Sequence, residues 1–71
     1  MAIEFEYDEG FEYESRIDFS ELSIDQQLQV LSKKDKATTR IVIEKVYAIG
    51  SISYEAYYYG PGGLIQKVDF Q

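Results

Sequence analysis

The sequence contains no cysteine and no histidine, it lacks tryptophan, and it has only one proline. Without cysteine no disulfide can support the core, and without cysteine or histidine a structural zinc site is nearly excluded. The most common general base and the strongest nucleophile of enzymes are also missing. Paired carboxylates could still catalyse, but they need a cleft and a raised pKa that 71 residues can hardly build. We therefore expect a protein that is not an enzyme and that uses no cofactor.

Long apolar runs are absent as well, since no segment approaches the roughly 20 residues that span a bilayer. The first residues lack a basic region followed by an apolar stretch, so no signal peptide is expected. The length predicts one domain over residues 1–71, which buries only about 60% of its unfolded surface. We expect a soluble protein of the cytoplasm, or of the host cytoplasm if the chain is viral.

Acidic residues are abundant and unevenly placed. The formal charge is −6, and residues 1–25 hold nine of the thirteen acids but only one base, Arg16. Phosphates would be repelled by this half of the chain, which disfavours direct nucleic-acid binding. Such asymmetry instead favours a partner with a basic surface.

The first nineteen residues alternate between apolar and acidic side chains, which is typical of strands with one dry face. Strands over 2–7 and 11–19 are predicted to form a hairpin around Asp8-Glu9-Gly10. In this register Glu6 lies opposite Glu12 and Glu4 opposite Glu14. Because like charges opposed across strands are destabilising, the arrangement suggests a use beyond solubility.

A capping box at Ser23 and Gln26 predicts a helix over 23–35. Ile24, Leu28 and Leu31 form its apolar stripe, which Val30 widens. Basic residues 33, 34, 36 and 40 follow. They either form a solvated helix end that suits the helix dipole, bind phosphates, or offset the field of the hairpin.

Two strands are predicted over 39–49 and 52–59, joined by a two-residue turn at Gly50-Ser51 that pairs Tyr47 with Tyr54. Ile43 and Tyr58 then lie on the core face, opposite a mixed face that includes Val42, Val46, Tyr57 and Tyr59. Gly60-Pro61-Gly62-Gly63 predicts another turn before a last strand at 64–70. Either a five-residue loop or a bulge near 57–59 would bring the apolar residues of this strand to the core face.

The fold class predicted from this order, ββαβββ, is α+β, with one helix packed on a twisted and mostly antiparallel sheet. An opening hairpin followed by a helix also resembles the ubiquitin-like β-grasp. That resemblance implies a fold only, and the chain ends in Phe70-Gln71 without the Gly-Gly tail used in conjugation.

The acidic hairpin is the main candidate site. Carboxylates two residues apart on a strand are about 6.6–6.8 Å from one another, close to the spacing of nucleic-acid phosphates. Tyr57 and Tyr59 are candidates because tyrosine is enriched at binding hot spots. A metal site at the hairpin tip is not expected, since a three-residue turn cannot enclose a calcium ion. The predicted partner-binding residues are Glu4, Glu6, Asp8, Glu9, Glu12, Glu14, Asp18, Tyr57 and Tyr59.

Three functions fit these features. The first is a non-enzymatic module that docks its acidic hairpin on a basic partner surface, in its extreme form a phage-type inhibitor that mimics nucleic acid. The second is a structural or assembly protein that self-associates through the mixed sheet face or a strand edge. The third is a ubiquitin-like adaptor, which requires the last strand to run parallel to the first.

Overall fold

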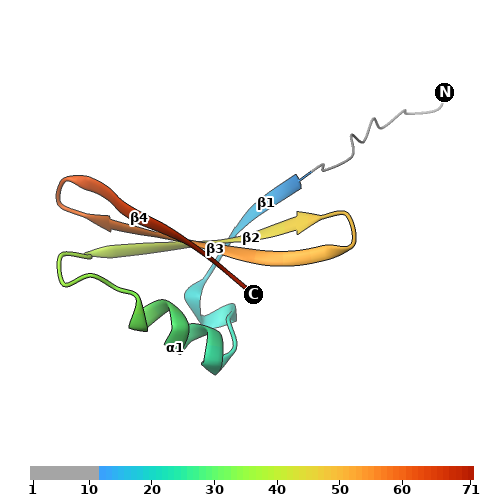
Figure 1. Cartoon of the computed structure of the whole chain (residues 1–71), viewed down its shortest axis with the longest axis horizontal. Coiled ribbons are helices and arrows are strands. Elements are labelled where there is room, and N and C mark those ends of the chain that lie inside the picture. Colours follow the sequence, from blue (N-terminus) through green and yellow to red (C-terminus); the bar gives the residue numbers. More distant parts are fainter. Residues whose placement is uncertain (1–11) are drawn as a thin grey trace.

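The computed structural model describes residues 12–71. Its elements are strand β1 (Glu12–Ile17), a 3-10 turn η1 (Phe19–Glu21), helix α1 (Ile24–Ser32), and strands β2 (Arg40–Ala48), β3 (Ser51–Gly60) and β4 (Gly63–Phe70). The strands form one antiparallel sheet in the order β1-β2-β3-β4, and α1 packs on one of its faces (Figure 1). The predicted α+β class is therefore confirmed.

The sheet is a simple meander over the described residues. β1 and β4 lie at opposite edges, and every strand pair in residues 12–71 is antiparallel. The β-grasp arrangement, which places the first and last strands side by side in parallel, is therefore wrong for this part of the chain. The predicted strand over 2–7 and the turn at 8–10 lie outside the described residues.

The strand predicted to reach residue 19 ends at Ile17, because the chain turns into η1. At this turn the Asp18 amide donates to the Glu21 carboxylate at 2.9 Å. Asp18 is thus an exposed residue at the start of a short helical turn. It does not continue the acidic alternation of β1.

The capping box of α1 is confirmed. The Gln26 amide donates to Ser23 Oγ at 3.1 Å, and the Ser23 amide donates to Gln26 Oε1 at 2.9 Å. The helix ends at Ser32, three residues earlier than predicted. Lys33 caps it with its amide directed to the carbonyls of Val30 and Leu31.

The turn between β2 and β3 consists of Ile49 and Gly50 rather than Gly50 and Ser51, because Ala48 pairs with Ser51. Gly50 has a φ of +78°, a value that only glycine adopts easily. Tyr47 consequently pairs with Ile52 and not with the predicted Tyr54. A shift of two residues keeps every side chain on its predicted face, so the faces are correct although the partners are not.

A bulge near the last turn keeps Val68 and Phe70 on the core side, whereas Leu64, predicted to face the core with them, pairs with Tyr59 on the sheet face opposite α1 and is 56% exposed. The pairing of β3 with β4 shifts between Tyr58 and Tyr59, as the bulge prediction required, and a two-residue loop joins Gly60 to Gly63. Val68 then pairs with Ala56, and Phe70 pairs and stacks with Tyr54 at a ring-centroid distance of 5.4 Å. The five-residue loop predicted as the alternative does not form.

The hydrophobic core lies between α1 and the sheet. Its buried residues are Leu22, Val30, Ile43, Ala56, Tyr58 and Phe70. The Tyr58 hydroxyl donates to the Val30 carbonyl at 2.7 Å, and the Gln66 side chain donates to the Lys33 carbonyl at 2.7 Å. These two bonds attach the second half of the helix to β3 and β4.

Candidate functional site

The candidate site is the sheet face opposite α1, called here the open face. Within residues 12–71 no helix covers it (Figure 1). Strand alternation directs four side chains to this face: Glu14, Glu44, Glu55 and Tyr57. Glu14 pairs with Val46, Glu44 with Glu55, and Tyr57 with Val42, and these positions alternate with the core residues. The acidic face of β1 and the mixed face of β2 and β3, predicted as separate surfaces, are therefore one surface.

Three carboxylates meet on the open face. Glu14, Glu44 and Glu55 each place an oxygen within 4.8 Å of the other two, and we call them the carboxylate cluster. Glu44 lies directly opposite Glu55, which in turn lies opposite Asp69. Like charges opposed in this way are destabilising, and the bases beside them, Arg16 opposite Glu44 and Lys67 paired with Glu55, offset part of this cost.

The repulsion changes the acidity of Glu14. Its pKa is raised, first because its carboxyl shares a hydrogen bond with Glu44, and then through partial desolvation and the charges of Glu55 and Glu44. When Glu14 is protonated, its carboxyl can donate a hydrogen bond, whereas an ionised carboxylate only accepts. Glu14 is exposed, so this proton exchanges with the solvent.

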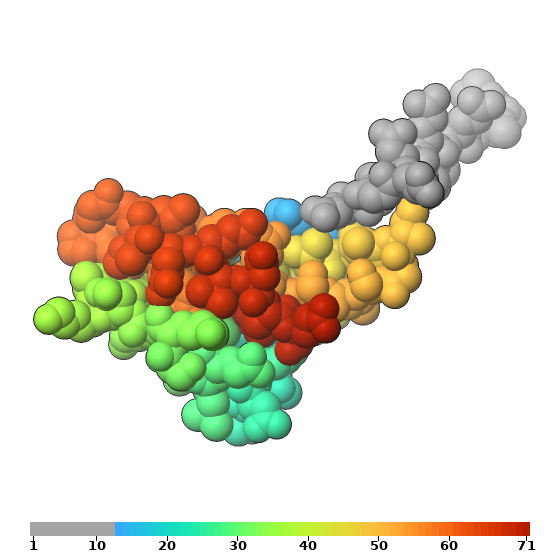
Figure 2. Space-filling view, viewed as in Figure 1, coloured from blue at the N-terminus to red at the C-terminus, as the bar shows by residue number. Residues whose placement is uncertain are grey.

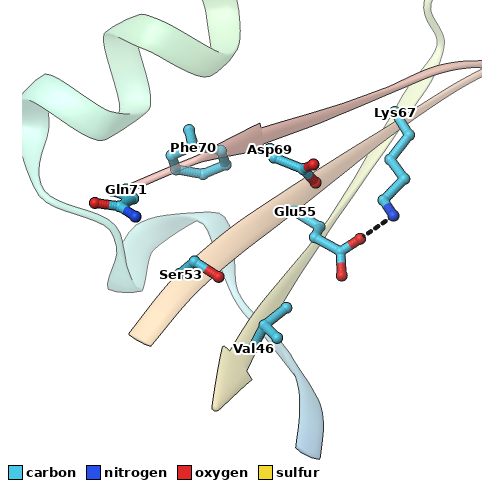
Figure 3. Close-up of a pocket in the computed structure, with 7 residues that line it drawn as sticks. All are labelled: Val46, Ser53, Glu55, Lys67, Asp69, Phe70 and Gln71. Carbon is cyan, nitrogen blue, oxygen red and sulfur yellow. Dashed lines mark ion pairs between the residues drawn. The ribbon is translucent and has the colours of Figure 1, made fainter. Parts of the chain in front are cut away.

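Glu55 is only 7% exposed, which is unusual for a charged side chain. It forms an ion pair with Lys67 (Figure 3). The Tyr57 hydroxyl also donates to its Oε2 at 3.2 Å. The Lys67 ammonium holds the pKa of Glu55 below its usual value, against the effect of burial. Burial and the nearby carboxylates raise the pKa of Tyr57 to about 12.

A shallow groove of about 440 Å³ adjoins the cluster where β4 ends. Figure 3 shows Glu55 and Lys67 turned toward each other in the groove, with Ser53 on the same strand as Glu55 and Val46 on β2. The groove combines an ion pair with small and apolar side chains. It can therefore accept an inserted side chain that is both long and polar at its tip.

Metal binding by the cluster is opposed by its surroundings. Three carboxylates on one flat face provide some oxygens, but calcium requires six to eight that converge on it. Lys67 already neutralises Glu55. The cluster is better suited to a cationic side chain, which a pair of carboxylate oxygens can bind from one side.

The predicted tyrosines are on the open face. Tyr57 pairs with Val42, and Tyr59 pairs with Arg40, whose guanidinium lies 4.5 Å from the Tyr59 ring centroid. Both tyrosines are half-buried, and Val42 and Val46 beside them are buried. They thus form the apolar part of a surface whose other part is acidic.

The remaining predicted site residues have different outcomes. Glu4, Glu6, Asp8 and Glu9 lie outside the described residues, and the backbone of Glu12 pairs with Ala48 at the start of β1. Lys33 and Lys34 lie at the end of α1, on the other side of the sheet, so they do not cover the carboxylate cluster. Glu44 and Glu55 were not predicted as site residues, although their places on the mixed face followed from strand alternation.

No helix within residues 12–71 is long and apolar enough to cross a membrane. No protein-family model, curated protein or solved structure matches this chain.

Proposed function

We propose that the protein is a non-enzymatic binding module that docks its open face on a protein partner with a basic surface. The observation that carries this proposal is the carboxylate cluster, which stands beside Tyr57 and the buried Val42 and Val46. The carboxylates of Glu44 and Glu55 lie between the apolar residues, with Val42 and Tyr57 on one side and Val46 on the other. In such interfaces charge directs the encounter and aromatic residues supply affinity. An inhibitor that mimics nucleic acid is the extreme form of this function.

The energetics of the cluster support a cationic ligand. The pKa of Glu14 is raised first by its hydrogen bond with Glu44, and then by partial desolvation and by the charges of Glu55 and Glu44. An arginine or lysine of a partner would offset these charges, so binding would release the proton from Glu14 and lower its pKa. The predicted affinity therefore rises with pH across the titration of Glu14.

Self-association through the open face, the second function considered from the sequence, is opposed by the same charges. Two copies placed face to face would bring Glu44, Glu55 and Asp69 of one against acidic residues of the other. Like charges across an interface cost several kcal/mol as an order of magnitude. The third function, a ubiquitin-like adaptor, loses its basis because β1 and β4 lie at opposite edges of the sheet.

The test is capture from native lysate on immobilised protein at low salt, with mass spectrometry of what elutes at high salt. The variant Glu14→Gln/Glu44→Gln removes two charges from the open face. The matched control Asp25→Asn/Asp35→Asn removes two charges on the helix side of the molecule. We expect the first variant, but not the control, to lose the salt-eluted partner.

A purified partner then gives a quantitative test. Its dissociation constant should increase with salt and should increase at least about tenfold in the Glu14→Gln/Glu44→Gln variant, since each close charge pair is worth about 1.5 kcal/mol or more. Equal losses in the variant and in the control would refute docking by the open face.

A further inference from the structure

The helix presents its apolar stripe to the outside. The exposed fractions of Ile24, Leu28 and Leu31 are 70%, 60% and 49%, whereas Val30 is 1% exposed. The prediction that this stripe packs on the sheet is therefore wrong. A different side of α1, the one that carries Val30, faces the sheet, and the Tyr58 hydroxyl bonds to the Val30 carbonyl there. We call these three residues the helix stripe.

Within residues 12–71 a second apolar surface is exposed on the same side of the molecule. The β2–β3 hairpin extends beyond the helix, toward the right of Figures 1 and 2, where α1 no longer covers the sheet. Three exposed strand residues on this end, Tyr13, Tyr47 and Ile52, face the helix side, since they alternate with the open-face residues. Together with exposed Ile49 in the adjoining turn they are called the hairpin patch.

The two surfaces complement each other between molecules rather than within one. In the part of the chain that the structure describes, no second sheet covers the outward side of α1 and no helix covers the hairpin end of the sheet. We propose that two copies of this chain pair around a two-fold axis, with the helix stripe of each copy packed on the hairpin patch of the other. The same contact then occurs twice, as in most homodimers.

The size of the surfaces supports the reciprocal arrangement. A helix of nine residues is about 13.5 Å long and about 10 Å wide, so pairing through helices alone falls well short of the roughly 800 Å² per partner in a standard interface. Using both surfaces of both copies doubles the apolar contact, which is still smaller than a standard interface and therefore predicts a weak, reversible dimer. It also places the two helices between the two sheets and leaves both open faces directed outward.

Charge also favours a second copy as the occupant. Glu21 and Asp25 lie at the N-terminal end of the helix stripe. Lys45 stands on the helix side of the hairpin patch, with its ammonium 5.2 Å from the Tyr47 ring centroid. In the dimer these opposite charges come together at each of the two contacts. A partner with an apolar surface but no acids would not provide this pairing.

Sedimentation velocity over a range of protein concentrations tests the dimer. The wild type should show a reversible monomer–dimer equilibrium. Leu28→Glu and Ile52→Lys should each raise the dissociation constant at least about 30-fold, because each places an unpaired charge in the contact. Leu64→Glu is the matched control, since Leu64 is as exposed as Ile52, at 56% against 51%, but lies near the far turn of β4.

Mixing the two variants tests reciprocity. A heterodimer of Leu28→Glu and Ile52→Lys has one contact between the new glutamate and the new lysine and one wild-type contact, so the mixture should recover dimer. Far-UV circular dichroism confirms that each variant is folded, as substitutions of exposed residues allow. A wild type that stays monomeric, a dimer that Ile52→Lys does not weaken, an equal effect of Leu64→Glu, or a mixture without recovery would each overturn the proposal.

Discussion

Replacing Tyr58 with phenylalanine tests how the helix is held to the sheet. Tyr58 is fully buried, and its hydroxyl donates to the Val30 carbonyl at 2.7 Å. A buried hydrogen bond contributes about 0.5–1.5 kcal/mol net. The Val30 carbonyl also accepts from the Lys33 amide at 3.3 Å, so it is not left without a partner. We therefore expect a loss near the middle of this range, about 1 kcal/mol.

In a domain of this size about 1 kcal/mol corresponds to a fall in Tm of roughly 4–8 °C. Thermal and urea unfolding at one fixed protein concentration measure it, because dimerisation would make the apparent stability depend on concentration. Tyr59→Phe is the control. In the described part of the chain the Tyr59 hydroxyl donates no hydrogen bond, so its removal should change stability by less than about 0.5 kcal/mol.

Alkaline pH provides a second readout of the same residue. Burial raises the pKa of Tyr58 above the ordinary value of 10.0. The folded protein therefore keeps the phenolic proton at pH values where the unfolded chain releases it, so stability is complete below pH 10 and falls as pH rises further. Tyr58→Phe should reduce this fall. Equal stabilities of Tyr58→Phe and Tyr59→Phe, with equal slopes above pH 10, would refute the role assigned to the hydroxyl.

Three further predictions concern other parts of the fold. Gly60→Ala should destabilise by about 1–3 kcal/mol in urea unfolding, because a Cβ there would lie 2.9 Å from the Ala37 carbonyl oxygen, a backbone atom that cannot easily move. Ser23→Ala should cost about 1 kcal/mol and lower the helical signal in circular dichroism, since it removes the cap of α1; no change would show that the cap is dispensable. Glu14→Gln should stabilise the protein at neutral pH and have no effect below about pH 4.5. Because the pKa of Glu14 is raised in the folded state, Glu14 favours folding only while it is protonated. This contribution to stability is lost as pH rises through the raised pKa. Stability curves at several pH values that show the opposite order would contradict the account of the carboxylate cluster.

The predicted elements succeeded where a local signal was complete. The capping box at Ser23 fixed the start of α1, because two side chains and two amides within four residues satisfy one another. The alternation in β2 and β3 assigned each residue to the correct face. The exact partners were wrong by two residues, since a turn at Gly50-Ser51 and a turn at Ile49-Gly50 leave the same faces buried.

The candidate site was predictable only in part. Glu14, Tyr57 and Tyr59 were singled out from the sequence, but Glu44 and Glu55 were not. Glu14 and Glu55 are 41 positions apart in the chain, and they meet because β1 pairs with β2 on the side opposite to β3. No local pattern encodes which strands are neighbours in a sheet.

The sequence by itself determined the chemistry and the local elements of this protein. The absence of cysteine and histidine, the concentration of acids in the first 25 residues, the capped helix and the alternating strands are all properties of short segments. The tertiary structure alone decided that Glu14 of β1 shares a face with Val42 and Tyr57, and that Val30 rather than the helix stripe is buried. Both depend on which surfaces the folded chain brings together, and a nine-residue helix with two apolar sides can bury either one until the sheet is formed.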